Sequence, residues 1–458
     1  MKQIVDPALL RRFDRQGPRY TSYPTAPCFH DGYTGADFAA DLIAEPVGRG
    51  LSLYVHLPYC DTLCYFCACN MKVSNDRSTI ADYLDALYLD LRLTAQRLHG
   101  QIVRQIHWGG GTPTHLTPTE IVALMGVIRE AFTVAPDAEV SVEIDPRGLT
   151  DGHLDALRDA GFNRASMGVQ DTDPAVQRAI NRIQPHEVTA FAIDGLRARG
   201  VGSINVDLIY GLPHQTLETI NRTVDDVLRL DPDRLAVFNF AIVPWMFKHQ
   251  RLIDGLPRAD AEEKIAIFSR LNDRLDDAGY AYVGMDHFAK ASDSLVIAQR
   301  SGNLRRNFQG YSTHEGLSIV ACGTSAISEL AGSYAQNVKH IGDYKRRIRE
   351  EGTATERGLR LTPDDQLRRR VIMDLMCNFA IYDQDFSDLL PAGQSFSSYF
   401  DAEIEGLTPF TEVGLIERTS DGLVVSNEGR MIIRNMAMVF DAWLPKLAAD
   451  QARFSRTV

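Results

Sequence analysis

The sequence predicts an α/β fold with a parallel sheet, followed by a mainly helical C-terminal domain. From residue 51 onward, short β-prone runs alternate with amphipathic helical stretches, and this rhythm repeats six times. Successive β-then-α units favour parallel strands joined by right-handed crossovers. Polar and glycine-rich segments follow the strands at the ends where parallel α/β folds place their active sites. The periodicity leaves open whether the sheet is flat or curled into a full or partial barrel.

Each element follows from a local pattern. The predicted strands are Leu51–His56, Val103–Trp108, Glu139–Ile144, Arg164–Val169, Ile204–Ile209 and Leu235–Ala241. The helices between them are predicted at 76–98, 118–132, 150–160, 186–199 and 216–229. Further helices are predicted at 363–380, 397–407 and 426–448, with a small hairpin at 415–418 and 422–425. Residues 1–34 are irregular but carry turn formers and aromatics in 17–25, which predicts an ordered arm.

Length and composition limit the class of protein. The chain has 458 residues, of which 45% are hydrophobic and 24% charged, as is usual for a soluble globular protein. Its net charge of −12 argues against a broad nucleic-acid or anionic-membrane surface. There is no apolar run long enough to span a bilayer and no secretory signal at the N-terminus. We therefore expect a cytoplasmic protein with neither a nucleic-acid nor a membrane partner.

Four cysteines lie within ten residues, at positions 60, 64, 67 and 69. The spacing C-x3-C-x2-C of Cys60, Cys64 and Cys67 suits three irons of a [4Fe-4S] cube, which leaves the fourth iron open for a ligand or substrate. Structural zinc normally uses separated ligand pairs, although Cys69 could supply a fourth zinc ligand. The isolated Cys28, Cys322 and Cys377 are expected to be small buried apolar residues.

Other polar residues stand at predicted strand ends. Gly109–Thr112 allows backbone amides to approach a ligand closely, and it lacks the features of a phosphate-binding loop. Glu143, Gln170, Arg182 and Asp207 could together bind an amine, a carboxylate and ribose hydroxyls, although each alone would be an ordinary surface or capping residue. The basic aromatic stretch 303–311 could bind a large anionic aromatic substrate, or be a solvated loop.

The motif Cys60-x3-Cys64-x2-Cys67, with Tyr65 and Phe66 inside it, resembles that of the radical S-adenosylmethionine (SAM) enzymes. Within this superfamily the chain is similar to the oxygen-independent coproporphyrinogen III oxidases over nearly its whole length. The matching segments include 17–26, 54–58, 60–70, 107–114, 143–147, 166–171, 206–213, 284–289, 306–311 and 325–327. The N-terminal arm, Cys69 and 307–311 specify the oxidase. Ala68, Ile242 and 314–318 depart from the family pattern.

The resemblance implies a partial (β/α)6 radical SAM barrel at 35–360, an N-terminal arm near the active site at 1–34 and a mainly helical domain at 361–458. It implies a [4Fe-4S] cluster on Cys60, Cys64 and Cys67, and two SAM molecules. The positions that match SAM-binding residues are Tyr54, Phe66, Gly110, Gly111, Thr112, Glu143, Gln170, Arg182, Asp207, Ala241 and Ile327. The positions that match catalytic or substrate residues are His56, Cys69, Phe308 and Gln309. Cys69 is then a residue near the site and not a cluster ligand.

The resemblance also implies a reaction. The reduced cluster cleaves SAM to a 5′-deoxyadenosyl radical, which removes hydrogen from a propionate of coproporphyrinogen III, and loss of CO2 and an electron leaves a vinyl group. Arg19, Arg305 and Arg306 are hypothetical partners for substrate carboxylates. We expect a monomer served by an electron donor such as flavodoxin or ferredoxin. The alternatives are a related haem-binding chaperone and a radical SAM methyltransferase that degrades haem.

Overall fold

The computed structural model describes residues 6–449, 454, 456 and 457. Contacts between residues divide the chain into two compact units. The barrel unit comprises residues 30–267 and 316–360, and the terminal unit comprises 268–315 together with the described residues of 1–29 and 361–458. The first five residues of the predicted arm lie outside the described residues, as do 450–453, 455 and 458 of the predicted C-terminal domain. The three-part division at 34 and 360 stays a prediction.

Parallel strands form the centre of the barrel unit. They pair in the order β1-β4-β5-β6-β7-β8, each parallel to its neighbour. This confirms the predicted parallel α/β fold. Their bounds are β1 (Leu51–Leu57), β4 (Ile102–Gly110), β5 (Thr133–Ile144), β6 (Arg164–Gln170), β7 (Ser203–Tyr210) and β8 (Arg234–Asn239). The strand predicted to reach Ala241 ends two residues earlier, where the Phe240 amide donates to Tyr210 O at 2.8 Å.

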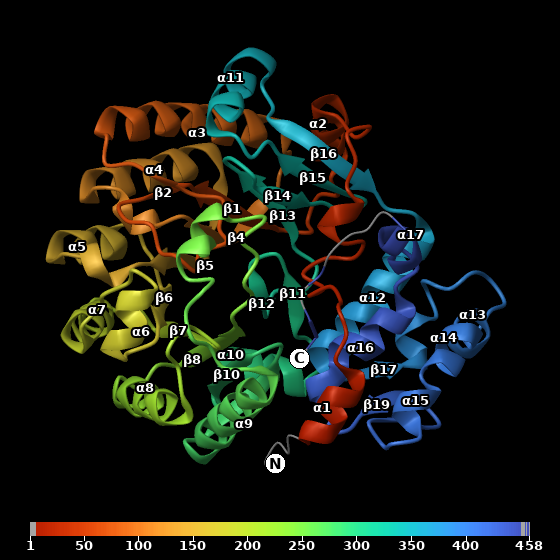
Figure 1. Ribbon diagram of the computed structural model, residues 1–458. Helices are drawn as coiled ribbons and strands as arrows, with labels where there is room; N and C mark the ends of the chain where they lie inside the picture. The colour runs from red at the N-terminus through yellow and green to blue at the C-terminus, as the bar shows by residue number, and fades with distance from the viewer. Residues whose placement is uncertain (1–5, 450–453, 455, 458) are drawn as a thin grey trace. The chain divides into compact units, whose positions relative to one another are not determined.

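Helices follow these strands in the chain and cover them. In Figure 1 they succeed one another in an arc along the outer side of the strands. The local sequence explains where they start, because Thr117 forms a capping box with Glu120 and Thr216 forms one with Thr219. Their bounds are α3 (Arg77–Arg97), α4 (Pro118–Ala131), α5 (Asp151–Asp159), α6 (Pro174–Ala179), α7 (His186–Ala198) and α8 (Leu217–Arg229). The predicted helices therefore lie within two residues of the observed ones.

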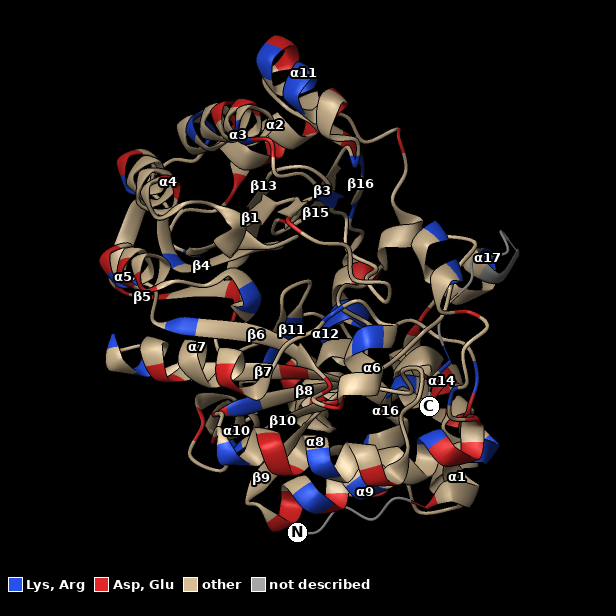
Figure 2. Cartoon of the chain, turned by 60° about the vertical axis from the view of Figure 1, so that its left-hand side comes forward, with Lys and Arg blue, Asp and Glu red and all other residues tan. Residues whose placement is uncertain are grey.

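The core of the barrel unit lies between the strands and these helices. Leu53, Val55, Trp108, Met167 and Leu208 of the central strands are completely buried. Buried positions alternate with half-buried ones along β6 and β7, so one face of these strands is covered more completely than the other. On the outward sides of the helices the charge is mixed, and Figure 2 shows acidic and basic residues interspersed along α3 and α11.

The strands on the far side of β1 from β4 were not predicted. Strand β13 (Ser318–Cys322) pairs parallel with β1, and β14 (Ile327–Glu329), β15 (Ser333–Asn337) and β16 (Thr355–Arg360) continue antiparallel. Within this unit the strand order runs from β16 to β8, so the described strands form an open arc and not a closed barrel. The remaining elements are α2 (Gly35–Ala44), β2 (Tyr59–Cys60), β3 (Lys72–Val73), η2 (Pro113–His115), η3 (Pro146–Gly148), η4 (Lys248–Leu252) and α11 (Ile341–Glu351). Helix α9 (Ala261–Asp277) contains a sequence boundary between the units.

The terminal unit is mainly helical, with short strands. The predicted hairpin forms as β18 (Ile416–Arg418) and β19 (Gly422–Val425), and α12 matches the first predicted helix. The predicted helices 397–407 and 426–448 are wrong as continuous elements. The second breaks at Asp441, whose carboxylate accepts from the amides of Trp443 and Leu444 and starts a new turn. The bounds are α1 (Pro7–Phe13), η1 (Ala26–Cys28), β9 (Tyr280–Gly284), β10 (His287–Lys290), α10 (Ser294–Arg300), β11 (Arg305–Asn307), β12 (Gly310–Ser312), α12 (Pro363–Asn378), β17 (Ala380–Tyr382), η5 (Asp383–Phe386), α13 (Phe396–Tyr399), α14 (Asp401–Gly406), α15 (Thr408–Thr411), η6 (Gly429–Ile432), α16 (Ile433–Ala437), η7 (Met438–Phe440) and α17 (Leu444–Ala449).

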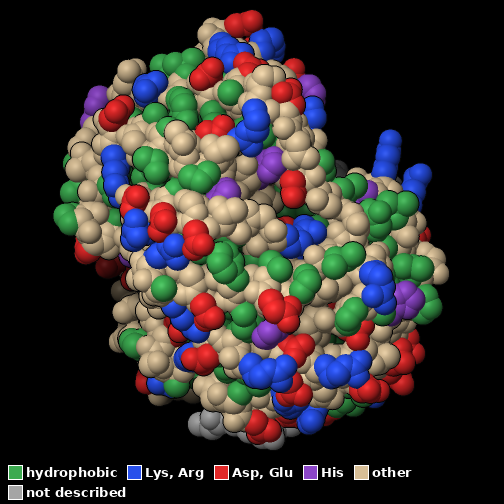
Figure 3. All heavy atoms as spheres, turned by 90° about the vertical axis from the view of Figure 1, so that its left-hand side faces the viewer, with side chains coloured by type: hydrophobic (Ala, Val, Ile, Leu, Met, Phe, Trp, Pro, Cys, Tyr) green, Lys and Arg blue, Asp and Glu red, His purple; other side chains and the backbone are tan. Residues whose placement is uncertain are grey.

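The surface carries both signs of charge, as the 48 basic and 60 acidic residues of the sequence lead one to expect. The face drawn in Figure 3 carries acidic and basic side chains side by side. Among the described residues, we find no helix with both the length and the apolar character needed to cross a membrane.

Candidate active site

The clustered cysteines lie directly after β1. The short strand β2 contains Cys60 and pairs with β3, which closes the loop between them. Cys60 and Cys64 are buried, Cys67 is half-buried and Cys69 is exposed. None of them forms a disulfide. The three cysteines of the predicted cluster motif are therefore free thiols on one loop at the carboxyl end of the first parallel strand.

Hydrogen bonds with other segments hold this cysteine loop, residues 60–71. Among them, three side chains donate to carbonyl groups of residues 63–67, and the Tyr65 amide donates to the carbonyl group of Ile180, directly after α6. The pairs are Asn181 Nδ2 with Leu63 O (2.8 Å), Gln250 Nε2 with Phe66 O (3.0 Å), His249 Nε2 with Cys67 O (2.7 Å), and Tyr65 N with Ile180 O (3.0 Å). Tyr65 and Phe66 also pack on a buried apolar cluster that includes Val176, Ile180 and Phe240. The loop is thus fixed on both sides.

Each of the three motif sulfurs receives a hydrogen-bond donor. Thr112 Oγ1 donates to Cys60 Sγ at 3.2 Å, and the Cys69 amide donates to Cys67 Sγ at 3.4 Å. Two guanidinium groups, those of Arg147 and Arg182, reach Cys64 Sγ at 3.5 and 3.6 Å. Donors of this kind stabilise thiolates, which are the form that binds iron.

These residues fit a [4Fe-4S] cluster. Among the residues that the structure describes, no group of three His, Cys, Asp or Glu side chains converges as it would around a single metal ion. A cube binds each thiolate to a different iron, so its sulfurs need not converge on one point. One nitrogen of Arg182, Nε, is buried without a hydrogen-bond partner beside this loop.

The glycine segment after β4 lies against the start of the cysteine loop. The Gly111 amide donates to Leu57 O at 2.8 Å, and a Cβ at Gly111 would lie 2.7 Å from the carbonyl carbon of Pro58. Gly110 has φ +116°, a conformation open mainly to glycine, and its amide donates to Glu143 Oε2 at 3.1 Å. The close approach needs glycine, and it brings Gly110, Gly111, Thr112 and Glu143 together.

Tyr54 and His56 lie in the second half of β1, shortly before the cysteine loop. The Tyr54 hydroxyl donates to His56 Nδ1 at 3.1 Å, and His56 Nε2 donates to Asn70 O at 2.9 Å. Burial lowers the pKa of His56. The imidazole is therefore neutral, with its proton on Nε2.

The ends of β6 and β7 supply Gln170 and Asp207. Gln170 is buried and has φ +69°, where the pairing of β6 with β7 shifts register. Asp207 accepts from Asn205 Nδ2 at 2.7 Å and Ser166 Oγ at 3.4 Å. Burial, followed by the nearby charge of Glu143, raises the pKa of Asp207 to about 7. Its carboxyl therefore titrates near neutral pH.

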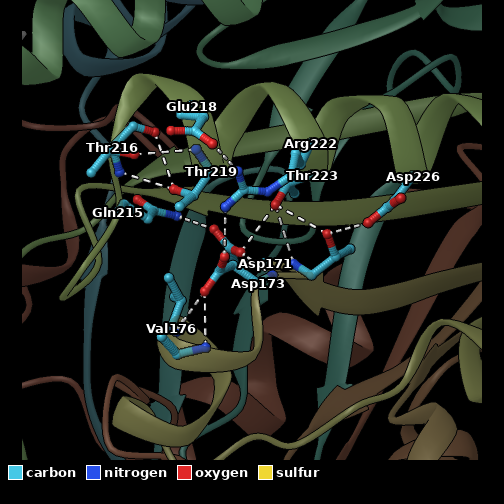
Figure 4. Close-up of polar contacts among 12 residues, drawn as sticks. Asp171, Asp173, Val176, Gln215, Thr216, Glu218, Thr219, Arg222, Thr223 and Asp226 are labelled. Carbon is cyan, nitrogen blue, oxygen red and sulfur yellow. Dashed lines mark hydrogen bonds and ion pairs between the residues drawn. The ribbon is translucent and has the colours of Figure 1, made fainter.

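A buried network lies directly behind Gln170. Asp171, the next residue, accepts from Gln215 Nε2 at 2.6 Å, from Thr223 Oγ1 at 3.0 Å and from the Asp173 amide at 2.7 Å. Figure 4 shows these donors converging on Asp171 from α8, from the turn before α8 and from its own loop. The network ties the end of β6, and with it Gln170, to α8.

Two predicted SAM residues contribute no polar side chain. Ala241 is exposed and lies in the loop after β8, and Ile327 is half-buried at the start of β14. Only their backbone or apolar surface is available to a ligand.

The other predicted residues belong to the terminal unit and are described by themselves. Phe308 and Gln309 form the turn between β11 and β12, and Arg306 on β11 lies with its guanidinium carbon 4.7 Å from the Tyr311 ring centre. Arg306 is buried, and its Nε and Nη1 have no hydrogen-bond partner among the described residues. Arg305 forms ion pairs with Glu315 and Asp374. The charges of Arg19, Arg434 and Arg306 all act on Asp286.

Sequence reasoning missed several residues of this edge. Asp145 and Arg147 were seen only as part of a matching segment, and Asn181, His249 and Gln250 carried no signal. Asp145 and Arg147 directly follow the end of β5, and polar residues at such strand ends are candidates for an active site. The last three act on backbone carbonyls of the cysteine loop, and no residue pattern reveals such contacts.

Comparison with known proteins agrees with the fold. The model of the radical SAM superfamily matches residues 54–227, and that of the HemN C-terminal domain matches residues 361–432. An oxygen-independent coproporphyrinogen III oxidase from Salmonella typhimurium is 44% identical over 99% of this chain and 98% of its own. One from Pseudomonas aeruginosa is 42% identical over the same shares.

A solved structure gives the same result. The coproporphyrinogen III oxidase HemN from Escherichia coli, described as a radical SAM enzyme, superimposes with a TM-score of 0.92 at 41% identity, covering 97% of this chain and 100% of that one. The chain therefore belongs to the oxygen-independent coproporphyrinogen III oxidases, within the radical SAM superfamily.

Proposed function

We propose that the protein converts coproporphyrinogen III to protoporphyrinogen IX without oxygen, by oxidative decarboxylation of two propionates to vinyl groups. One observation carries this function. Three free cysteines with radical SAM spacing lie on a fixed loop at the end of the first parallel strand, in a chain that matches such oxidases over almost its full length. It is an oxidoreductase of haem biosynthesis.

Membership of the radical SAM superfamily implies a [4Fe-4S] cluster and SAM. When bound, these groups supply one electron and the 5′-deoxyadenosyl radical that starts the decarboxylation. Cys60, Cys64 and Cys67 are the residues that we assign to the cluster. Because two propionates react, we further propose that two SAM molecules are bound.

The residues around the cysteine loop are suited to SAM. Arg182 can donate from Nε to the SAM carboxylate, because that nitrogen is buried without a partner, whereas Nη1 and Nη2 already donate to Asp145 and to Gly168 O. The Glu143 carboxylate and the backbone of Gly110 and Gly111 can bind the ammonium group of SAM. Asp207 and Gln170 can bind ribose hydroxyls. Tyr54, Phe66, Thr112, Ala241 and Ile327 complete the proposed set.

His56, Cys69, Phe308 and Gln309 are proposed to act on the substrate. His56 holds a proton on Nε2 and accepts on Nδ1, so it is a neutral hydrogen-bonding group. Among the arginines, Arg306 is the best candidate for a propionate, because it is buried with two unpartnered nitrogens. Arg19 is the second. Arg305 would have to release ion pairs with Glu315 and Asp374, which makes it the weakest candidate.

We propose a reducing cytoplasm as the setting and a flavodoxin or ferredoxin as the electron donor to a monomer. All seven cysteines are free, as is usual in reducing compartments. The reaction needs one electron from outside for each SAM molecule that is cleaved.

The decisive experiment is anaerobic reconstitution with iron, sulfide and reductant, followed by SAM and coproporphyrinogen III. Protoporphyrinogen IX and 5′-deoxyadenosine should both form, in proportion to each other. Cleavage of SAM without decarboxylation would contradict the proposal and favour the haem-binding chaperone or the haem-degrading methyltransferase.

A further inference from the structure

Arg147 contacts a cysteine of the cluster motif, although nothing in the reaction described above requires it. It lies in η3, directly after β5, and its side chain is 17% exposed. Its Nη2 lies 3.5 Å from Cys64 Sγ. The position is therefore within reach of the buried thiol and largely out of water.

Asp145 fixes the guanidinium of Arg147. Arg147 Nε donates to both carboxylate oxygens, at 3.0 and 3.1 Å, and Nη2 donates to Oδ2 at 2.6 Å. A guanidinium held by two parallel donors has little freedom to turn away. The direction of Arg147 toward Cys64 is thus set by the protein and not by chance on a surface.

Arg182 brings a second guanidinium group to Cys64. Asp145 also accepts from Arg182 Nη1 at 2.9 Å, and that nitrogen lies 3.6 Å from Cys64 Sγ. Two guanidinium groups therefore lie against the sulfur of Cys64 and share the carboxylate of Asp145, while the charge of Asp61 also acts on Arg147.

Cys60 accepts from the neutral hydroxyl of Thr112, and Cys67 accepts from the neutral amide and thiol of Cys69. The charge of Arg182 also acts on Cys67, but the described structure brings no guanidinium group within hydrogen-bond distance of that sulfur.

Such an arrangement has a definite effect on an iron–sulfur cluster. Hydrogen bonds to the ligand sulfurs and nearby charge set the reduction potential of the cluster. One-electron reduction adds a negative charge, and a fixed cation in a largely buried site stabilises the more negative state. Removal of the cation should make the cluster harder to reduce.

We propose that Arg147 raises the reduction potential of the cluster through its charge-assisted hydrogen bond to Cys64, and that Asp145 is the residue that positions it. This inference rests on the proposed function, because it assumes the cluster. Arg147 acts through Cys64 and is therefore a positioning residue. Its role differs from that of Arg182, which is assigned to SAM.

The test is an anaerobic redox titration of reconstituted protein without SAM, followed by electron paramagnetic resonance of the reduced cluster. Replacement of Arg147 by Met (R147M) should lower the midpoint potential, while iron content and circular dichroism stay as in the wild type. Loss of one charge-assisted bond corresponds to roughly a tenfold change in the reduction equilibrium, or about 59 mV for one electron.

The chain offers a matched control. Arg164 on β6 pairs with Glu139 on β5 at 2.8 Å, and the side chains are 16% and 19% exposed. This pair resembles that of Arg147 and Asp145 in burial, but the described structure gives it no contact with a thiol. R164M should therefore leave the potential unchanged.

Each outcome is decisive. A wild-type potential in R147M would overturn the inference, and so would an equal shift in R164M. If R147M does not retain iron, R147Q decides in the same way. Loss of iron in both Arg147 variants, with R164M intact, would show that Arg147 holds the loop together and would also overturn it. Failure of the wild type itself to assemble a cluster would instead contradict the proposed function.

Discussion

Asp207 shows how burial can make a single residue sensitive to pH. Its pKa of about 7 means that it is only partly ionised at neutral pH. An ionised carboxylate accepts from ribose hydroxyls better than a protonated one does. SAM should therefore bind more tightly as the pH rises from 6 to 8, by up to about tenfold.

Equilibrium binding of SAM to reconstituted protein measures this effect. The variant Asp207→Asn should bind SAM with an affinity that hardly changes over the same pH range. Asp159→Asn, at an exposed position on α5, is the control and should keep the wild-type slope. A flat wild-type profile would contradict the role of Asp207.

Cys69 differs from Cys60, Cys64 and Cys67 because we do not assign its thiol to the cluster. Cys69 is an exposed residue, its backbone amide donates to Cys67 Sγ, and its thiol also contacts Cys67. A serine keeps that amide, so Cys69→Ser should retain the iron content of the wild type. Turnover should fall by about 10²-fold, if the thiol takes part in proton transfer.

Iron analysis and product assays on the same preparations separate the two effects. Cys67→Ser is the comparison and should lose iron. Loss of iron from Cys69→Ser would make Cys69 a ligand after all.

At the scale of elements, the turn after β4 depends on a glycine. A Cβ at Gly111 would meet the backbone of Pro58 and Tyr59 at 2.7–2.8 Å, and backbone cannot move aside as a flexible side chain can. Gly111→Ala should therefore destabilise the protein by about 1–3 kcal/mol and weaken SAM binding.

Denaturant unfolding and SAM titration measure both effects. The control is Gly148→Ala, because nothing lies within 4 Å of a Cβ at Gly148 and its backbone is not left-handed. Equal behaviour of the two variants would disprove the crowding argument.

Asp171 joins β6 to α8, and its ionisation has a cost in stability. Burial raises its pKa to about 6, against hydrogen bonds that lower it. A raised carboxyl pKa contributes stability below its unfolded value near 4, and this contribution is lost as the pH rises through 6. The loss amounts to about 3 kcal/mol at pH 7.

Asp171→Asn removes this group from the titration. The stability of Asp171→Asn relative to the wild type should therefore increase as the pH rises from 4 to 7, because only the wild type loses stability over this range. Asp194→Asn, at an exposed position on α7, should show no such trend. A constant difference between Asp171→Asn and the wild type would mean that Asp171 does not titrate in this range.

At the scale of the whole molecule, a cluster bound only by the folded chain should stabilise it. Anaerobic calorimetry before and after removal of iron should show a higher unfolding temperature for the loaded protein. The stabilisation should be about 3 kcal/mol or more, if iron is bound at a hundred times its dissociation constant. A variant with Cys60, Cys64 and Cys67 all replaced by Ala should show no response to iron and sulfide.

The sequence predicted the repeating part of the molecule well. Strands β1 to β8 and their helices follow a period that is local, so residues such as Leu53 and Val224 reveal it directly. It predicted the edge at β13–β16 poorly, because those strands pair with β1 or with one another through contacts distant in sequence. The cysteine motif marked the loop at which we propose the cluster, but the contacts of Arg147, His249 and Gln250 with that loop depend on folding and leave no pattern.

The hydrogen bonds that Asn181, His249 and Gln250 donate to the cysteine loop, and the one that Ile180 O accepts from it, have a consequence for how the enzyme matures. Fixing a residue's backbone costs about 1–2 kcal/mol of entropy. Because protein groups order this loop, that cost is met during folding and not during metal loading. The loop that carries the thiols is therefore ordered before iron binds. We therefore expect protein stripped of iron to keep its circular dichroism spectrum and to rebuild a cluster from iron and sulfide without being refolded.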